Sequence, residues 1–155
     1  MSMMKKVVVI SVIVGGLYFG ARAAMPRGIR NKNPMNIEYD KSNDWEGQTG
    51  TDGRFATFSS SIYGIRAGAK LISNYMTNYN LTSVIQILER FAPATENHTA
   101  GYAKFVAEKM GITPSERITK AQIPSMIKAM IQMENGIQPY SDDHILKACK
   151  MAGVV

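Results

Sequence analysis

Glu134 has the setting best suited to chemistry, because it lies near the carboxyl-terminal end of a predicted apolar helix. Apolar residues at helical spacing between positions 123 and 131 predict that helix, and Gly136 predicts its end. A carboxyl group in the last turn faces the negative pole of the helix dipole, which disfavours its charged form, and partial burial acts in the same direction. A glycosidic general acid must hold its proton near neutral pH, so this position predicts such an acid. An exposed Glu before a helix end has the same spacing, and spacing alone leaves both interpretations open.

Two further carboxylates, Glu38 and Asp52, lie between residues 31 and 58, in a segment rich in Asn, Asp and Gly. Glycosidases that use two carboxyl groups keep the second one across the cleft from the general acid. Glu38 and Asp52 are therefore candidates for a second acid or for a group that orients water. Solvated surface carboxylates are equally common in such a segment, so both alternatives stay open for each residue.

Three aromatic residues, Trp45, Tyr102 and Tyr140, are candidates for stacking on sugar rings. Aromatic side chains in small domains are core residues at least as often, because they bury a large apolar area. Sugar stacking and core packing therefore stay open as alternatives for all three.

Charge and residue counts limit other kinds of chemistry. The net charge is +6, but from Ala24 onward fifteen Lys and Arg face twelve Asp and Glu, a net charge of about +3. No basic stripe alternates with aromatic residues, so we expect no nucleic-acid partner. Two histidines and one cysteine are too few for a metal site, and we expect neither a metal nor a cofactor. Cys149 is predicted to be a core residue of the last helix.

The chain from residue 25 to 155 predicts one mostly helical α+β domain with one small antiparallel sheet. Short alternating pieces and the turn candidate Asp52-Gly53 predict a hairpin within residues 35–58, and residues 25–28 are predicted to be a linker. Helices are predicted from Ser61 to about Tyr79, from Thr82 to a stop at Pro93, from about Thr99 to Gly111, from Thr119 to Gly136 and from Ser141 to Met151.

Residues 1–24 are predicted to be a membrane anchor or a signal segment. Two lysines precede an uncharged apolar run from Val7 to Ala21, which Arg22 ends. Fifteen residues are fewer than the roughly 20 that a bilayer span needs and are close to the apolar core of a signal peptide. If the Arg22 side chain reaches the interface, residues 23–25 extend the span. We expect residues 5–24 to form an apolar anchoring helix, with a cleaved signal peptide as the alternative.

The stretch Ala129–Ser141, A-M-I-Q-M-E-N-G-I-Q-P-Y-S, resembles the catalytic helix of lysozyme-like lytic transglycosylases. That helix has the approximate form A-I-I-x-x-E-S-G-F-x-P-x-x-x-S. The resemblance assigns Glu134 as the catalytic glutamate and aligns Gly136 and Pro139 with the glycine and proline of the family. Asn135 stands where the family has serine, which puts the helper hydrogen bond of that serine in doubt.

The segment from residue 27 to residue 75 is similar to phage and prophage wall-degrading domains that open with R-G-I-R-N-N-N-P-G-N-I. Here the run is R-G-I-R-N-K-N-P-M-N-I, with Met35 in place of glycine, which predicts an altered turn. The similarity continues through D-W-E-G-Q, D-G-R-F-A-T-F and G-I-R-A, and then through F-A-P and E-N-H-T-A-G-Y. Together the resemblances cover about four-fifths of the chain, and they imply a phage origin.

A run of the form N-P-x-N-I, W-x-G and F-x-x-F-x-S also follows the catalytic helix in bacterial autolysin glucosaminidases. In this chain the helix that resembles the catalytic one lies at the other end, so the two resemblances together imply a circularly permuted lysozyme-like fold. In such a fold Glu134 faces the segment 33–48 across one cleft. Asn33, Asn36 and Gln48 are therefore candidate substrate-binding residues.

The resemblance implies a peptidoglycan-degrading enzyme that cleaves the glycan strand for phage entry or lysis. A lytic transglycosylase needs Glu134 alone, because the 6-hydroxyl of the sugar replaces water, whereas a muramidase would also use Glu38 or Asp52. The alternatives are an endopeptidase that cuts the peptide bridge and a non-catalytic virion or membrane protein that binds the wall. The expected partners are peptidoglycan, the membrane and other virion proteins. We expect the chain in the virion or as a single-pass protein of the bacterial inner membrane, with its domain in the periplasm.

Overall fold

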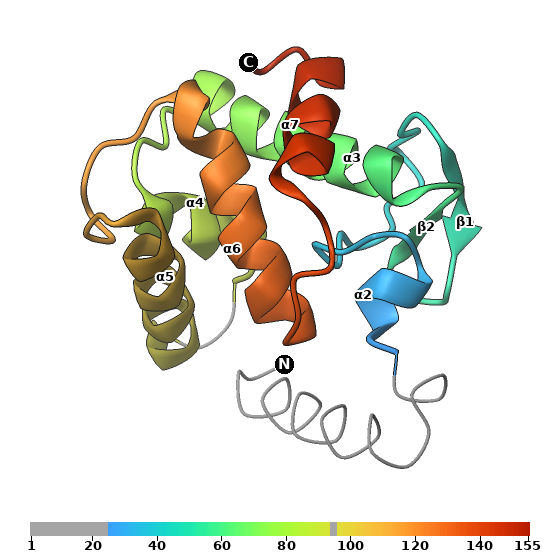
Figure 1. Ribbon diagram of the computed structural model, residues 1–155, viewed down its shortest axis with the longest axis horizontal. Helices are drawn as coiled ribbons and strands as arrows, with labels where there is room; N and C mark the ends of the chain where they lie inside the picture. The colour runs from blue at the N-terminus through green and yellow to red at the C-terminus, as the bar shows by residue number, and fades with distance from the viewer. Residues whose placement is uncertain (1–24, 94–95) are drawn as a thin grey trace.

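The computed structural model describes residues 25–93 and 96–155. The apolar helix predicted at residues 5–24 lies outside the described residues. None of the helices in the described part combines the length and the apolar character needed to cross a membrane. The described part is mostly helical with one small antiparallel sheet, which confirms the predicted α+β class (Figure 1).

The sheet is a two-stranded antiparallel hairpin in which β1 (Gln48–Thr51) pairs with β2 (Ala56–Phe58). Both strands lie inside residues 35–58, as predicted. An isolated bridge between Glu38 and Phe55 brings the preceding loop against the hairpin. The loop that carries the candidate carboxylate Glu38 is thereby fixed to the only sheet found among the described residues.

The first described helix is α2 (Arg27–Arg30), which corrects the prediction of a linker at residues 25–28. Four residues make about one helical turn, so no apolar period in the sequence reveals such a helix. Gly28 is its buried residue, and a Cβ atom there would lie 2.9 Å from Asn36 Oδ1 and 2.6 Å from Asn135 Oδ1. Glycine therefore lets α2 approach the end of a later helix closely.

The five longer helices predicted from apolar spacing and cap residues are all present. They are α3 (Ser61–Asn78), α4 (Val84–Phe91), α5 (Glu96–Met110), α6 (Ile123–Asn135) and α7 (Asp142–Met151). Ser141 caps α7 as predicted, because its side chain accepts a hydrogen bond from the backbone N–H of His144 at 3.1 Å.

Three helix starts differ slightly from the prediction. Ser83, not Thr82, is the N-cap of α4, because its hydroxyl is the one that accepts from the backbone N–H of Gln86 at 3.4 Å. Helix α5 begins at residue 96 instead of Thr99, since its polar first residues do not show the apolar spacing that predicted its start. Thr119 precedes a short 3-10 turn, η1 (Lys120–Gln122), that leads into α6.

Helix α6 lies at the centre of the domain. It contacts α2, α3, α5 and α7, and Figure 1 shows it running between α5 on one side and α3 with α7 on the other. Its side chains Met126, Ile127, Met130 and Ile131 are fully buried, each contributing about 1.5–3 kcal/mol to folding. Cys149 of α7 is also buried in this core, which confirms its prediction as a core residue. The carboxyl-terminal end of α6 is thus a firmly held support for the side chains it carries.

Candidate active site

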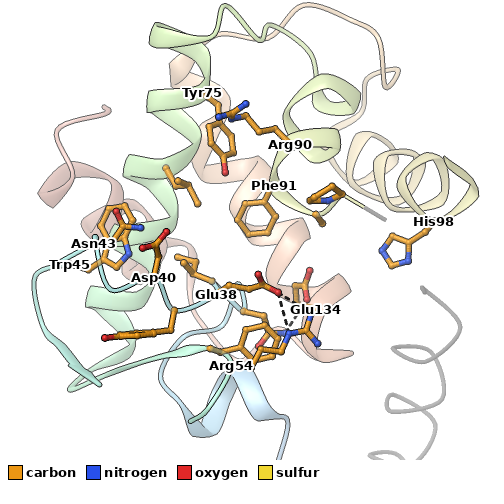
Figure 2. Close-up of a pocket in the computed structure, with 17 residues that line it drawn as sticks. Glu38, Asp40, Asn43, Trp45, Arg54, Tyr75, Arg90, Phe91, His98 and Glu134 are labelled. Carbon is orange, nitrogen blue, oxygen red and sulfur yellow. Dashed lines mark hydrogen bonds and ion pairs between the residues drawn. The ribbon is translucent and has the colours of Figure 1, made fainter. Parts of the chain in front are cut away.

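Glu134 occupies the last turn of α6, two residues before Gly136 ends the helix with a φ of 76°. Its side chain is half-buried and lines a cleft of about 510 Å³ (Figure 2). Among the described residues, Asn36 Nδ2 donates to Oε1 of this carboxyl group at 3.0 Å, and the Tyr102 hydroxyl donates to Oε2 at 2.9 Å. A carboxyl group oriented from both oxygens in an accessible cleft is placed to exchange a proton with a bound molecule.

The loop that presents Asn36 to Glu134 is organised by Asn33. Asn33 is fully buried, and its Nδ2 donates to the backbone oxygens of Ile37 and Ala56 at 2.9 and 2.8 Å. Its Oδ1 accepts from the backbone N–H of Ile37 at 3.0 Å. Asn33, which was predicted to bind substrate, therefore shapes the loop instead. Asn36, another predicted substrate-binding residue, contacts the carboxyl group of Glu134.

The local backbone of this loop suits Asn36. Its φ is 53°, in the left-handed region that asparagine tolerates better than most side chains. Met35, the residue for which the sequence resemblance predicted an altered turn, does not have a positive φ and is fully buried. Its side chain fills the space over Gly68 of α3, where an added Cβ would lie 2.1 Å from the Met35 sulfur. The loop is therefore packed against α3 as well as against α6.

Asn135 ties the same loop directly to the end of α6. Its side chain is fully buried, and Nδ2 donates to the backbone oxygens of Pro34 at 2.7 Å and Ile131 at 2.8 Å. Asn135 is the position at which the sequence departs from the serine of the transglycosylase helix that it resembles. Asparagine here provides a different contact, which fixes the distance between the Asn36 loop and the helix that carries Glu134.

Tyr102 comes from α5 and is 1% exposed. Burial raises the pKa of its hydroxyl well above the ordinary value of 10.0, and the nearby charge and hydrogen bond of Glu134 raise it further. The hydroxyl therefore remains a neutral donor at physiological pH. Tyr102, a candidate for sugar stacking, has its ring in the core and contributes its hydroxyl to the site instead.

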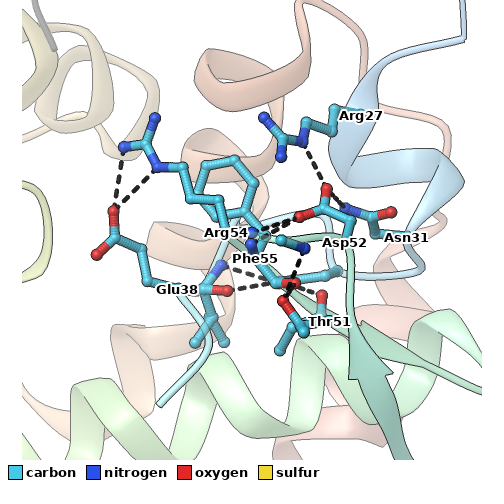
Figure 3. Close-up of polar contacts among 11 residues, drawn as sticks. Arg27, Asn31, Glu38, Thr51, Asp52, Arg54 and Phe55 are labelled. Atoms are coloured by element: carbon cyan, nitrogen blue, oxygen red, sulfur yellow. Dashed lines mark hydrogen bonds and ion pairs between the residues drawn. The ribbon is translucent and has the colours of Figure 1, made fainter.

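Glu38 also lines the cleft, and Figure 2 shows it in the same lower part of the cleft as Glu134. Its Oε1 accepts from Arg54 Nε at 3.2 Å and from Nη2 at 3.0 Å (Figures 2 and 3). The side chains of this ion pair are exposed to solvent. Glu38 is therefore brought into the same cleft as Glu134, with a guanidinium as its fixed partner.

Asp52 does not line this cleft. Its Oδ2 accepts from Arg27 Nε at 2.5 Å and Asn31 Nδ2 at 2.7 Å, and Oδ1 accepts from the backbone N–H groups of Arg54 and Phe55 (Figure 3). The Arg27 guanidinium is the main cause that holds the pKa of this carboxyl far below its ordinary value of 3.8. Asp52 is thus an ionised group that closes the hairpin turn and joins it to α2.

The other predicted site residues are divided between the cleft and its surroundings. Trp45 lines the cleft and also borders a second hollow of about 380 Å³. Gln48 accepts from the backbone N–H of Trp45 at 3.3 Å, so it shapes the Trp45 loop. Tyr140 lies outside the cleft lining, where its ring stacks on His144 with centroids 5.4 Å apart. Only Trp45 of these three is therefore positioned to meet a ligand in the cleft.

Several residues that line the cleft were not singled out from the sequence. They come from the ends of α3 and α4 and from α5, and they include Tyr75, Arg90, Phe91 and His98 (Figure 2). His98 is 3% exposed, and its ring centroid lies 6.3 Å from that of Tyr102. The F-A-P and E-N-H-T similarities covered this region, and they were the one signal in the sequence that could have pointed to it.

The amino-acid sequence of the chain is similar to that of a phage protein. Protein P5 of Pseudoalteromonas phage PM2 is 42% identical to the chain over 125 residues, which are 78% of this chain and 78% of that protein. No protein-family model matches the chain.

Proposed function

The chain belongs to the family of Protein P5 of Pseudoalteromonas phage PM2, and we propose that it cleaves the glycan strand of peptidoglycan with Glu134 as general acid. The observation that carries the proposal is the carboxyl group of Glu134, held by Asn36 and Tyr102 where α6 ends in a cleft of about 510 Å³. A cleft of this size accommodates a few sugar units.

In this mechanism Glu134 first donates its proton to the oxygen of the scissile glycosidic bond. The bond between that oxygen and the anomeric carbon then breaks, and the sugar develops positive charge at that carbon. The Glu134 carboxylate next removes the proton from the hydroxyl that attacks the anomeric carbon, which restores the acid. In a lytic transglycosylase the attacking group is the 6-hydroxyl of the same sugar, and in a muramidase it is water.

The arrangement of the carboxylates favours the transglycosylase form of the reaction. Asp52 lies outside the cleft with four donors on its two oxygens, so it is not available as a second acid. Glu38 lines the cleft but accepts twice from Arg54. A reaction that needs one carboxyl group suits this geometry better than one that needs two.

The proposal includes a lysozyme-like fold with permuted chain order. It is supported by the contact between the amino-terminal loop and the carboxyl-terminal helix, where Asn36 meets Glu134 and Asn135 meets Pro34. These segments are separated by about a hundred residues in the chain, and a permutation would make them neighbours in sequence.

The two alternatives have less support in the geometry. A cysteine endopeptidase needs a reactive thiolate, but Cys149 is buried and burial raises the pKa of its thiol to about 12. Within residues 25–93 and 96–155, no three His, Cys, Asp or Glu side chains come together as metal ligands. A protein that only binds the wall has no separate support in the geometry, and it would release no soluble fragments from sacculi.

Digestion of purified sacculi by the full chain tests the proposal. We expect soluble muropeptides whose muramyl ends carry the 1,6-anhydro ring, which makes them lighter by one water than the products of a muramidase. Hydrolysed reducing ends would instead show a muramidase, and newly freed amino groups would show an endopeptidase. Intact sacculi after incubation with folded protein would contradict glycan cleavage altogether.

The location of the protein forms part of the same proposal. The substrate lies outside the inner membrane, so residues 5–24 would anchor the chain there or in the virion with the domain on the periplasmic side. Protease added to spheroplasts should then digest the domain, and a domain that resists the protease until the cells are lysed would contradict this orientation.

A further inference from the structure

A cation is fixed over two aromatic rings at the end of the cleft opposite Glu134. The guanidinium carbon of Arg90, in the last turn of α4, lies 3.6 Å from the ring centroid of Tyr79 and 5.3 Å from that of Tyr75. Arg90 and Tyr75 both line the cleft, and Figure 2 shows them at its upper end, with Glu134 at its lower end. The two rings limit the positions that the long Arg90 side chain adopts.

This stacking leaves hydrogen-bond donors of Arg90 free for a ligand. A guanidinium that lies over an aromatic ring contacts the ring with its flat face. Its N–H groups lie in the plane of the guanidinium and point away from the contact. Tyr75 also lines the cleft, and Figure 2 shows its hydroxyl pointing toward the middle of the cleft, at the end of the ring away from the guanidinium. Burial raises the pKa of Tyr75, so its hydroxyl remains a donor at neutral pH. The guanidinium and the neutral hydroxyl therefore both offer donors to an anionic ligand in this part of the cleft, and a carboxylate is the anion that a guanidinium binds with two parallel hydrogen bonds.

The charges along the cleft point to the same kind of ligand. Arg54, the other arginine of the lining, is paired with Glu38 at 3.0 Å. For Arg90, no carboxylate of the described residues lies within ion-pair distance. The end of the cleft farthest from Glu134 therefore carries a positive charge that an anionic ligand would neutralise.

We propose that Arg90 and Tyr75 form a subsite for a carboxylate on a substituent of the glycan, the peptide stem of peptidoglycan. This inference rests on the proposed function. It predicts that the cleft selects a glycan that carries acidic peptides over a neutral glycan without them. Arg90 is then a specificity-determining residue that binds substrate away from the bond that Glu134 cleaves.

A purely structural role of Arg90 makes a different prediction. A cation at the end of a helix interacts favourably with the helix dipole, and its contacts with the tyrosines stabilise the packing of α3 on α4. Removing such a residue would lower stability and would weaken the binding of acidic and neutral ligands equally. A subsite instead predicts a loss that depends on the charge of the ligand.

The experiment compares two soluble peptidoglycan fragments: tetrasaccharides with free peptide carboxylates, and the same fragments with those carboxylates converted to amides. Binding is measured by calorimetry in the full chain carrying Glu134→Gln, which prevents turnover. Arg90→Gln should weaken binding of the acidic fragment about tenfold and that of the amidated fragment less than twofold. Arg90→Lys should weaken binding of the acidic fragment less than Arg90→Gln does, since lysine keeps the positive charge but lacks the planar guanidinium with its parallel N–H donors. Arg117→Gln, at an exposed arginine outside the cleft lining, serves as the matched control and should change neither.

Equal weakening of both fragments by Arg90→Gln, or no weakening of either, would overturn the subsite. Those results leave glycan cleavage standing if the unmodified chain still digests sacculi. Failure of the proposed function itself has a separate signature, because the unmodified chain would then neither bind the fragments nor release muropeptides, and the subsite would fall with it.

Discussion

Asn135→Ala removes the side chain that holds the Asn36 loop against the end of α6. Two hydrogen bonds are lost, to the backbone oxygens of Pro34 and Ile131, each worth about 1 kcal/mol. The Pro34 oxygen loses its side-chain donor, which costs roughly 1–3 kcal/mol more. Asn135 Oδ1 is buried without a hydrogen-bond partner among the described residues, so its removal returns about 1 kcal/mol. The expected decrease in the free energy of unfolding is therefore about 2–4 kcal/mol.

Urea denaturation at neutral pH measures this decrease, and Asn135→Asp provides the matched comparison. Aspartate has nearly the volume of asparagine, but a carboxylate oxygen replaces the donor Nδ2. That oxygen would face the backbone oxygens of Pro34 and Ile131. We expect it to cost about 3–5 kcal/mol, more than alanine, because an uncompensated charge is buried. Asn74→Ala, at an exposed position of α3, should change stability by less than about 0.5 kcal/mol. If Asn135→Ala cost no more than Asn74→Ala, or if aspartate were tolerated better than alanine, the structural role given to Asn135 would be wrong.

Two further predictions concern pH. The pKa of Tyr102 is raised above 10.0 in the folded protein, so the Tyr102 hydroxyl ionises at a lower pH in the unfolded chain than in the folded one. The stability that Tyr102 contributes is therefore complete below pH 10 and is lost as the pH rises toward the folded pKa. Tyr102→Phe should therefore reduce the loss of stability between pH 9.5 and 11 in thermal denaturation, and an unchanged alkaline profile would contradict the buried contact. The pKa of Asp52 is lowered below 3.8 in the folded protein. The stability that the ionised Asp52 contributes is therefore complete above pH 3.8 and is lost as the pH falls from there toward the folded pKa. Asp52→Asn should lower stability at pH 7 by on the order of 1–2 kcal/mol and make it less dependent on pH between 4 and 2, whereas an unaltered acid limb would contradict this account.

Local sequence patterns predicted much of the fold. The apolar spacing after Ser61 predicted α3, although its N-cap is Ser60 and not the predicted Ser61. Ser141 with two acids predicted α7, because caps depend on neighbouring residues. Helix α2 could not be predicted in this way. Its single turn is fixed by Gly28, which approaches two asparagines from distant parts of the chain.

The site could be predicted only where its chemistry depends on one element. Glu134 was a candidate because a helix end and a family resemblance meet at that residue. The roles of Tyr102 and Asn135 were missed, since a tyrosine that donates to Glu134 from the core looks in sequence like any other aromatic residue. Arg90 was missed for the same reason, because its setting depends on how α4 packs beside the end of α3.

Turnover of purified sacculi by the Glu134→Gln chain tests the central claim most directly. The amide keeps the volume of the side chain, and its oxygen can still accept from Asn36 while its NH2 group donates to the Tyr102 hydroxyl, but it cannot deliver a proton. We expect the release of muropeptides to fall on the order of 10²–10⁴-fold while the melting temperature stays close to that of the unmodified protein. Near-normal release by Glu134→Gln, together with loss of activity in Glu38→Gln, would show that the reaction is centred on Glu38 and would contradict the role of Glu134.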